Sequence, residues 1–244
     1  MKNFIIIAGP CSIENMDMAL STANFLSQLK IEYFRANIYK IRTYPDSFQG
    51  LGIKGIPILR EIKEKFSLKI VTEINDTGQL NKELLNIVDI IQIGARNMQN
   101  THLLKSLGKI NKPILLKRGI SATLDEWIAA GKYIINSGNN NIIFCERGIR
   151  CYEHSTRNVL DINWPLILKE RVNKPVILDP SHSCGNRKLV NKISLVSRFI
   201  GLDGIMVEVH PDPDNALSDG AQSLDFNTFT KLIKDLENIK PLSI

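Results

Sequence analysis

Short apolar runs rich in β-branched residues alternate along the chain with longer segments in which apolar residues recur at helical spacing. A short continuous apolar run predicts a strand buried on both faces, and helical spacing predicts an amphipathic helix packed against the sheet. The predicted strands are residues 4–8, 32–39, 68–74, 88–93, 113–117, 141–145, 175–178 and 204–209. The predicted helices are residues 19–29, 55–65, 77–85, 101–108, 124–137, 163–171, 189–199 and 225–238.

Strict alternation of strand and helix is typical of a parallel sheet with helices as crossover connections. The chain has 244 residues, which is close to the usual size of one closed α/β barrel. The rival architecture is an open doubly wound sheet, in which a G-x-G-x-x-G motif or a P-loop would follow a strand, and the sequence contains neither after its first strand. We therefore predict an α/β fold of the (β/α)8, or TIM barrel, type, with residues 1–244 as one catalytic domain.

The composition is that of a soluble cytoplasmic protein with no membrane association. Hydrophobic residues make up 43% of the chain, yet no apolar run approaches the roughly 18 residues that span a bilayer, and the first apolar run lacks the length and cleavage pattern of a signal peptide. The four cysteines lie far apart and form no C-x-x-C pair. We expect free thiols or metal ligands rather than a disulfide framework.

The positive charges follow the predicted strands. The chain has 31 Lys and Arg against 25 Asp and Glu, a net charge of +6, but no run of basic residues. Nucleic-acid binding would require a continuous basic face, so this distribution favours a phosphorylated small molecule and no nucleic acid. The basic residues that follow strands are Arg35, Lys40, Arg42, Arg96, Lys117, Arg118 and Arg147.

Cys11, His182, Glu208 and Asp219 each lie at or just beyond the end of a predicted strand. Taken singly, each has an ordinary structural explanation: a packed thiol, a locally hydrogen-bonded imidazole, or a solvated or helix-capping carboxylate. Closure of the barrel would bring the carboxyl ends of all strands to one rim. One thiolate, one imidazole and two carboxylates together suit a divalent transition metal better than Mg²⁺.

Three of the cations lie where a strand leaves the core. Lys117 directly continues the apolar residues 114–116, Arg147 closely follows the apolar run 142–145, and Arg96 follows residues 90–95. Lys and Arg ordinarily cover surfaces, but at the exit of a buried strand a cation needs an anionic partner. A bound ligand or pair of ligands with two phosphates and one carboxylate would supply anionic partners for these cations.

Eight segments of the chain resemble 3-deoxy-D-arabino-heptulosonate 7-phosphate (DAHP) synthases of the short, type I beta branch. Together they extend over most of the chain, in the order expected for the family. They read AGPCSIE at 8–14, SFQGLG at 47–52, QIGARNMQN at 92–100, LLKRG at 115–119, CERGIR at 145–150, LDPSH at 178–182, MVEVHP at 206–211 and LSDGAQSL at 217–224.

The resemblance implies roles for individual residues. It implies that the metal ligands are Cys11, His182, Glu208 and Asp219, the same set that the barrel argument brings together. It implies that phosphoenolpyruvate is held by Arg35, Lys40, Ala95, Arg96, Lys117 and Arg147. The aldose phosphate would be held by Lys40, Arg42 and Thr43.

The implied reaction is a metal-dependent, aldol-type condensation of phosphoenolpyruvate with erythrose 4-phosphate and water, the first step of the shikimate pathway to the aromatic amino acids. The cofactor would be Mn²⁺, Fe²⁺, Co²⁺ or Zn²⁺. The expected catalytic residues are Lys117 as a proton donor, Glu146 as a base, and the ligands Cys11 and His182.

The resemblance also implies a homodimer or homotetramer. We expect no regulatory extension, because the predicted barrel occupies nearly the whole sequence.

The aldose segment departs from the family. Related chains usually read Lys-Pro-Arg-Thr-Ser there, whereas this chain reads Lys40-Ile41-Arg42-Thr43-Tyr44. Loss of the proline frees a fixed φ angle, and Tyr44 is much larger than serine. An alternative is therefore a 3-deoxy-D-manno-octulosonate 8-phosphate synthase, which uses arabinose 5-phosphate, although its usual Asn-Arg-Ser-Ser segment fits less well. A further alternative is a catalytically inactive barrel that binds a phosphorylated ligand.

Overall fold

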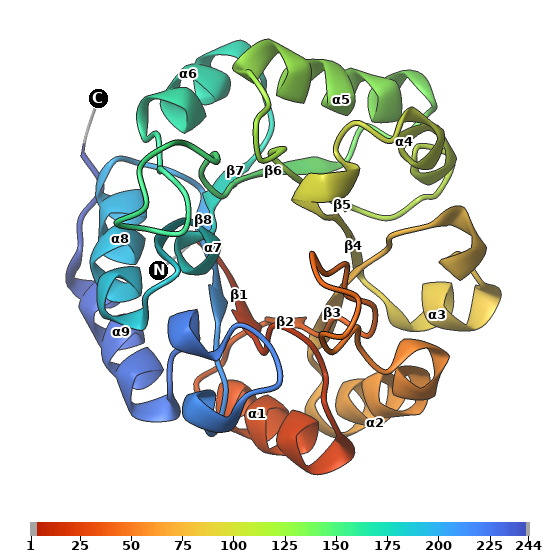
Figure 1. Cartoon of the computed structure of the whole chain (residues 1–244), viewed down its shortest axis with the longest axis vertical. Coiled ribbons are helices and arrows are strands. Elements are labelled where there is room, and N and C mark those ends of the chain that lie inside the picture. The colour runs from red at the N-terminus through yellow and green to blue at the C-terminus, as the bar shows by residue number, and fades with distance from the viewer. Residues whose placement is uncertain (1–3, 243–244) are drawn as a thin grey trace.

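The computed structural model describes residues 4–242, and within them eight parallel strands close into a barrel in sequence order (Figure 1). The barrel closes where the first strand pairs with the last, with Gly9 opposite Glu208 at the carboxyl end of that pair. The predicted (β/α)8 barrel is therefore confirmed. The strands are β1 (Ile5–Gly9), β2 (Tyr33–Arg35), β3 (Lys69–Glu73), β4 (Ile90–Ile93), β5 (Ile114–Lys117), β6 (Ile142–Glu146), β7 (Val176–Leu178) and β8 (Gly204–Glu208).

Helices form a ring around the strands (Figure 1). They are α1 (Met16–Gln28), α2 (Ile56–Phe66), α3 (Lys82–Ile87), α4 (Thr101–Leu107), α5 (Leu124–Asn136), α6 (Asn163–Arg171), α7 (Pro180–Cys184), α8 (Arg187–Phe199) and α9 (Phe226–Asn238). Among residues 4–242, no helix combines the length and the apolar character needed to cross a bilayer.

The apolar core has two layers, as the alternation of side chains along buried strands requires. The larger layer lies between the sheet and the helices, where Phe34, Trp127 and Phe144 are buried. The smaller layer fills the barrel and consists of Ile7, Val71, Ile90, Leu115, Ile143, Cys145, Ile177 and Met206. Because the interior is filled with side chains, a ligand can bind only at a rim.

Two predicted elements differ from the structure, and one helix was not predicted. The strand predicted at 32–39 is shorter, because Tyr33 and Phe34 pair with both neighbouring strands and Arg35 pairs with β3 alone. The helix predicted at 77–85 is a 3-10 turn (Thr77–Gln79) followed by α3, which Asn81 starts by accepting a hydrogen bond from the Leu84 amide. The short helix α7 directly after β7 was not predicted.

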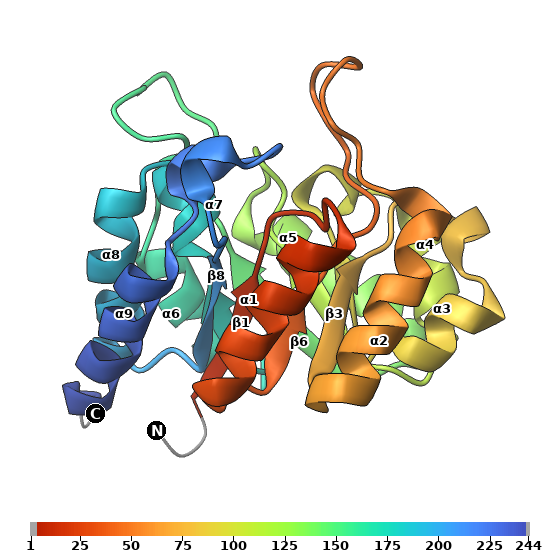
Figure 2. The ribbon, with the colours of Figure 1, turned by 90° about the horizontal axis from the view of Figure 1, so that it is seen from below.

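The loops at the carboxyl ends of the strands rise on one side of the barrel. Figure 2 shows two long loops projecting there, one after β2 and one after β6, whereas α9 ends on the opposite side. In barrel enzymes the carboxyl ends of the strands carry the active site. The predicted ligands and cations therefore lie at the rim where such a site is expected.

Candidate active site

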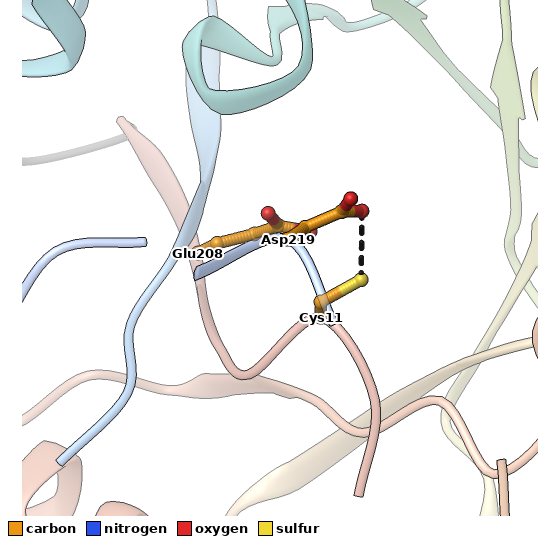
Figure 3. A group of neighbouring side chains, drawn as sticks. All are labelled: Cys11, Glu208 and Asp219. Atoms are coloured by element: carbon orange, nitrogen blue, oxygen red, sulfur yellow. Dashed lines mark hydrogen bonds between the residues drawn. The ribbon is translucent and has the colours of Figure 1, made fainter. Parts of the chain in front are cut away.

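Cys11, Glu208 and Asp219 offer three ligand atoms that lie within 4.8 Å of one another (Figure 3). Glu208 is the last residue of β8, and Cys11 lies just beyond the end of the neighbouring strand β1. Asp219 comes from the loop after β8, where it adopts a left-handed φ of 52°. The Cys11 thiol donates a hydrogen bond to Asp219 Oδ2 at 3.0 Å.

His182 approaches the same two carboxylates from α7. Its Nε2 atom lies 3.4 Å from Glu208 Oε1 and 3.8 Å from Asp219 Oδ2. Its Nδ1 atom lies 2.7 Å from Asp179 Oδ2, so the ring is oriented with Nε2 toward the cluster. The structure thus brings together all four residues that the sequence proposed as ligands.

The donor set fits a divalent transition metal. Borderline metals such as Mn²⁺, Fe²⁺, Co²⁺ and Zn²⁺ accept thiolate, imidazole and carboxylate ligands. Glu208 Oε1 is buried and accepts no hydrogen bond from the described residues; Arg35 Nη1 lies 3.1 Å from it as an ion pair, and a metal ion would give this oxygen a direct ligand bond as well. At metal sites the ring nitrogen of a histidine that does not face the metal commonly contacts a carboxylate, as His182 Nδ1 contacts Asp179 here.

The protonation of these groups follows from their burial. Burial, together with the charge of Glu208, raises the pKa of Cys11 to about 12 in the protein alone. Burial lowers the pKa of His182 to about 4 against the opposing effect of Asp179, so its imidazole is neutral at pH 7. Burial opposes ionisation of Asp219, but Lys40, His182 and Arg157 together lower its pKa. Metal binding would therefore displace the Cys11 proton and find an unprotonated histidine.

A pocket rich in cations opens beside this cluster, and His182 lies in its wall. Almost all of its charged lining is positive. The charged and polar residues that line it are Lys40, Arg42, Thr43, Ser47, Glu73, Arg96, Lys117, Arg147, Arg150, Arg157, Asn158 and His182. Ala95 also lines the pocket. Such a set of fixed cations is suited to a ligand that carries several negative charges.

Lys117 and Arg147 are the most buried cations of the pocket. Lys117 forms an ion pair with Asp179, which links it to His182 through the same carboxylate. Burial lowers the pKa of Arg147 to about 10, so this guanidinium is still charged at pH 7. A buried cation without a full set of anionic partners is costly, and a bound phosphate or carboxylate would relieve that cost.

Apart from the ligands Cys11, Glu208 and Asp219, two predicted site residues do not line the pocket. Arg35 is fully buried beneath the cluster, with Nη1 3.1 Å from Glu208 Oε1, although its Nε atom has no hydrogen-bond partner among the described residues. The Glu146 carboxylate is buried against Arg118 at 2.9 Å and also accepts the backbone N–H groups of Arg147 and Gly148. This geometry does not favour Glu146 as a base, because its oxygens shape the turn that carries Arg147.

Glu73 lies in the pocket, although the sequence analysis did not propose it. It is the last residue of β3, only 7% exposed, and its Oε2 atom accepts a hydrogen bond from Gln92 Nε2 at 2.7 Å. A Cβ atom at Gly94 would lie 2.1 Å from Glu73 Oε1, so glycine there leaves room for the carboxylate. The position of Glu73 at a strand end was the available signal.

The chain is similar to several known proteins. The sequence model of the family described as "DAHP synthetase I family" matches residues 2–241. The phospho-2-dehydro-3-deoxyheptonate aldolase of Thermotoga maritima is 50% identical over 236 residues, which cover 97% of this chain and 70% of that protein. The 2-dehydro-3-deoxyphosphooctonate aldolase of Legionella pneumophila is 30% identical over 258 residues, covering 97% and 91%.

Two solved structures of the Thermotoga maritima DAHP synthase are also similar. One superposes with a TM-score of 0.92 at 50% identity and covers 96% of this chain and 68% of that chain. A truncated form superposes with a TM-score of 0.88 at 46% identity and covers 96% of this chain and 85% of that chain.

Proposed function

Because this chain belongs to the DAHP synthetase I family, we propose that it joins phosphoenolpyruvate to erythrose 4-phosphate and water, giving DAHP and inorganic phosphate. It is an enzyme of the DAHP synthase type; the identity of its two substrates is the proposal. The observation that carries this proposal is a cation-lined pocket that opens onto His182 of the four-residue cluster. The proposed reaction is the first step of the shikimate pathway and would take place in the cytoplasm, in a homodimer or homotetramer.

Cys11, His182, Glu208 and Asp219 are the residues that would hold the metal ion. When bound, a divalent ion such as Mn²⁺, Fe²⁺, Co²⁺ or Zn²⁺ would supply Lewis-acid polarisation of the aldehyde oxygen. The two carboxylates already lie 3.4 and 3.8 Å from His182 Nε2, which supports a preorganised site.

Phosphoenolpyruvate would lie in the deeper part of the pocket. Lys117, Arg96 and Arg147 line it and would hold the phosphate and the carboxylate, next to the backbone of Ala95. Lys40 lines the same pocket, whereas Arg35 does not line it, although its buried Nε atom has no hydrogen-bond partner among the described residues. In the reaction, C3 attacks the aldehyde carbon, water adds to C2, and the C–O bond to the phosphate breaks. Fixed cations around the departing phosphate favour that last step.

The proton transfers would involve Lys117 and Glu73. Lys117 forms an ion pair with Asp179 and lines the pocket, so it is placed to donate a proton to the reacting substrate. Glu73 is the carboxylate among the pocket-lining residues, which makes it a better candidate than Glu146 to orient the attacking water. We therefore propose no catalytic role for Glu146.

The aldose phosphate would bind at the segment 40–44, where Arg42 and Thr43 face the pocket. Arg96 Nη2 donates a hydrogen bond to Thr43 Oγ1 at 3.1 Å, which joins this segment to the phosphoenolpyruvate region. Changing Arg42 to Ala is expected to raise the KM for the aldose phosphate by about 10- to 100-fold, because one charge-assisted contact to phosphate is lost. The KM for phosphoenolpyruvate should change by less than about threefold.

Steady-state kinetics with each substrate varied in turn would measure both constants. Arg60→Ala is the matched control, because Arg60 pairs with Glu83 on the outer helices with both side chains about half exposed. An equal rise of both KM values in Arg42→Ala would contradict the assignment of this segment to the aldose.

Acceptor choice depends on Ile41 and Tyr44, which also line the pocket. Both differences from the family segment are at uncharged positions, so Lys40 and Arg42 are retained. The Tyr44 side chain is 72% exposed and leaves these phosphate-binding groups in place. We expect erythrose 4-phosphate to be preferred by kcat/KM over arabinose 5-phosphate and ribose 5-phosphate. The double variant Ile41→Pro with Tyr44→Ser should sharpen that preference, because proline restricts the φ angle of the segment.

Assays of the metal-loaded protein with phosphoenolpyruvate and each aldose phosphate would test this choice. A preference for arabinose 5-phosphate that the double variant reverses would identify Ile41 and Tyr44 as the cause and support the octulosonate alternative. No turnover with any of the three acceptors would support the inactive-barrel alternative instead.

A further inference from the structure

Arg157 and Gln222 contact the outer oxygens of the two carboxylates in the candidate metal site. Arg157 Nη1 donates to Asp219 Oδ1 at 3.0 Å and to Gln222 Oε1 at 2.7 Å. The other end of the Gln222 amide, Nε2, donates to Glu208 Oε2 at 2.6 Å. A continuous chain of hydrogen bonds therefore runs from one carboxylate to the other through two side chains.

The opposite oxygens of the same carboxylates face the proposed metal position. Asp219 Oδ2 accepts the Cys11 thiol at 3.0 Å and lies 3.8 Å from His182 Nε2. Glu208 Oε1 lies 3.4 Å from His182 Nε2. Each carboxylate thus presents one oxygen to the cluster, while its second oxygen is occupied by Arg157 or Gln222.

The backbone that carries Arg157 is fixed to the helix that carries His182. The Arg157 amide donates to the Cys184 carbonyl at 3.1 Å, and Asn158 Nδ2 donates to the His182 carbonyl at 2.7 Å. A Cβ atom at Gly185 would lie 2.4 Å from Arg157 Cβ, so the two segments are in close contact. The loop between β6 and α6 is therefore docked on α7, and Arg157 extends from it to the Asp219 loop.

Gln222 is held as firmly at the other end of the chain of bonds. Its side chain is 2% exposed, and it ends the 3-10 turn Gly220–Gln222 that begins directly after Asp219. The backbone N–H of Gln222 donates to the Asp219 carbonyl at 3.2 Å, so the two residues keep a fixed spacing. An amide side chain can donate to one group and accept from another, which a carboxylate at this position could not do.

We propose that Arg157 and Gln222 are positioning residues that hold Asp219 and Glu208 as single-oxygen metal ligands. Bidentate binding by either carboxylate would require its outer oxygen to leave a hydrogen bond made by Arg157 or Gln222. Outer partners of this kind orient the ligands before the metal binds and typically contribute about 10- to 100-fold in metal affinity. This inference rests on the proposed metal role of Cys11, His182, Glu208 and Asp219.

The test compares divalent-metal binding by the full chain and its variants, in the absence of substrates. Gln222→Leu removes both amide contacts, and Arg157→Met removes the guanidinium contacts while keeping an unbranched apolar side chain. Titration with Mn²⁺ by calorimetry should give a dissociation constant raised by about 10- to 100-fold in each variant. Arg157→Lys, which retains the charge and one donor, should recover part of that loss. The control is Arg171→Met, because Arg171 pairs with Asp125 where both side chains are exposed.

The absorption spectrum of the Co²⁺-loaded protein gives a second reading that a purely structural role would not change. The thiolate charge-transfer band should persist in Gln222→Leu, because Cys11 is intact, while the d–d bands should change intensity as the carboxylate geometry changes. If Arg157→Met does not fold, as judged by circular dichroism, Gln222→Leu and Arg157→Lys decide the question.

The outcomes separate this inference from the function on which it rests. Parent protein that binds no Mn²⁺ or Co²⁺ would overturn the metal site itself, and the positioning role with it. Parent protein that binds tightly, alongside variants with affinities within about twofold and unchanged Co²⁺ spectra, would overturn the positioning role alone. Weakened binding in both variants, with the Arg171→Met control at the parental value, would support it.

Discussion

Removal of divalent metal is expected to abolish turnover, and Cys11→Ala is expected to weaken metal binding by at least about 100-fold. The reason is the composition of the cluster: a thiol, an imidazole and two carboxylates converge, which is a donor set suited to a divalent transition metal. Loss of Cys11 removes the ligand that selects for borderline metals. Chelator treatment followed by assay, and then by addition of Mn²⁺ or a similar ion, would measure both loss and recovery.

The other cysteines supply the controls for this experiment. Cys145 is buried in the inner layer of the barrel, and Cys151 lies in the loop after β6. Neither belongs to the cluster, so Cys145→Ala and Cys151→Ala should keep a metal affinity within about threefold of the parent. Full activity in a sample shown to be free of metal would contradict the proposed role of the four ligands.

Most of the fold was predictable from the sequence because a barrel strand is buried on both faces. The continuous apolar runs at 114–116 and 142–145 left little alternative to central parallel strands, and the structure places β5 and β6 there. The end of β2 was harder to predict, because Asn37 and Ile38 remain buried beyond the backbone hydrogen bond from the Ala36 amide to the Val71 carbonyl of β3. Burial continued there while the pairing did not, and a hydrophobicity pattern reports only burial.

The sequence was sufficient to predict which loops meet at the site. It was not sufficient to predict where each side chain points. The rule that strand ends converge in a barrel brought Cys11 and Glu208 together correctly, since β1 and β8 are adjacent. The same rule could not distinguish Glu146, which faces Arg118, from Glu73, which faces the pocket. Arg157 carried no strand-end signal at all, because it extends to the cluster from a long loop.

Lys117→Met is expected to lower kcat by about 100- to 10,000-fold, the range typical of a lost general acid or base. Lys117 is 4% exposed, lies in the wall of the anion pocket, and is held by the carboxylate that also orients His182. Its ammonium is thus positioned both to bind a substrate anion and to deliver a proton. We therefore expect the KM for phosphoenolpyruvate to rise as well, because one cation of its pocket is lost.

The control for this loss of charge is Lys169→Met, since Lys169 forms an ion pair with Asp203 away from the pocket. A second variant, Lys117→Arg, separates charge from proton transfer. Arginine keeps the positive charge but does not release a proton near neutral pH, so it should restore phosphoenolpyruvate binding more than kcat. Recovery of kcat to within about tenfold of the parent in Lys117→Arg would show that charge alone suffices, and the proton would then have to come from another group of the pocket.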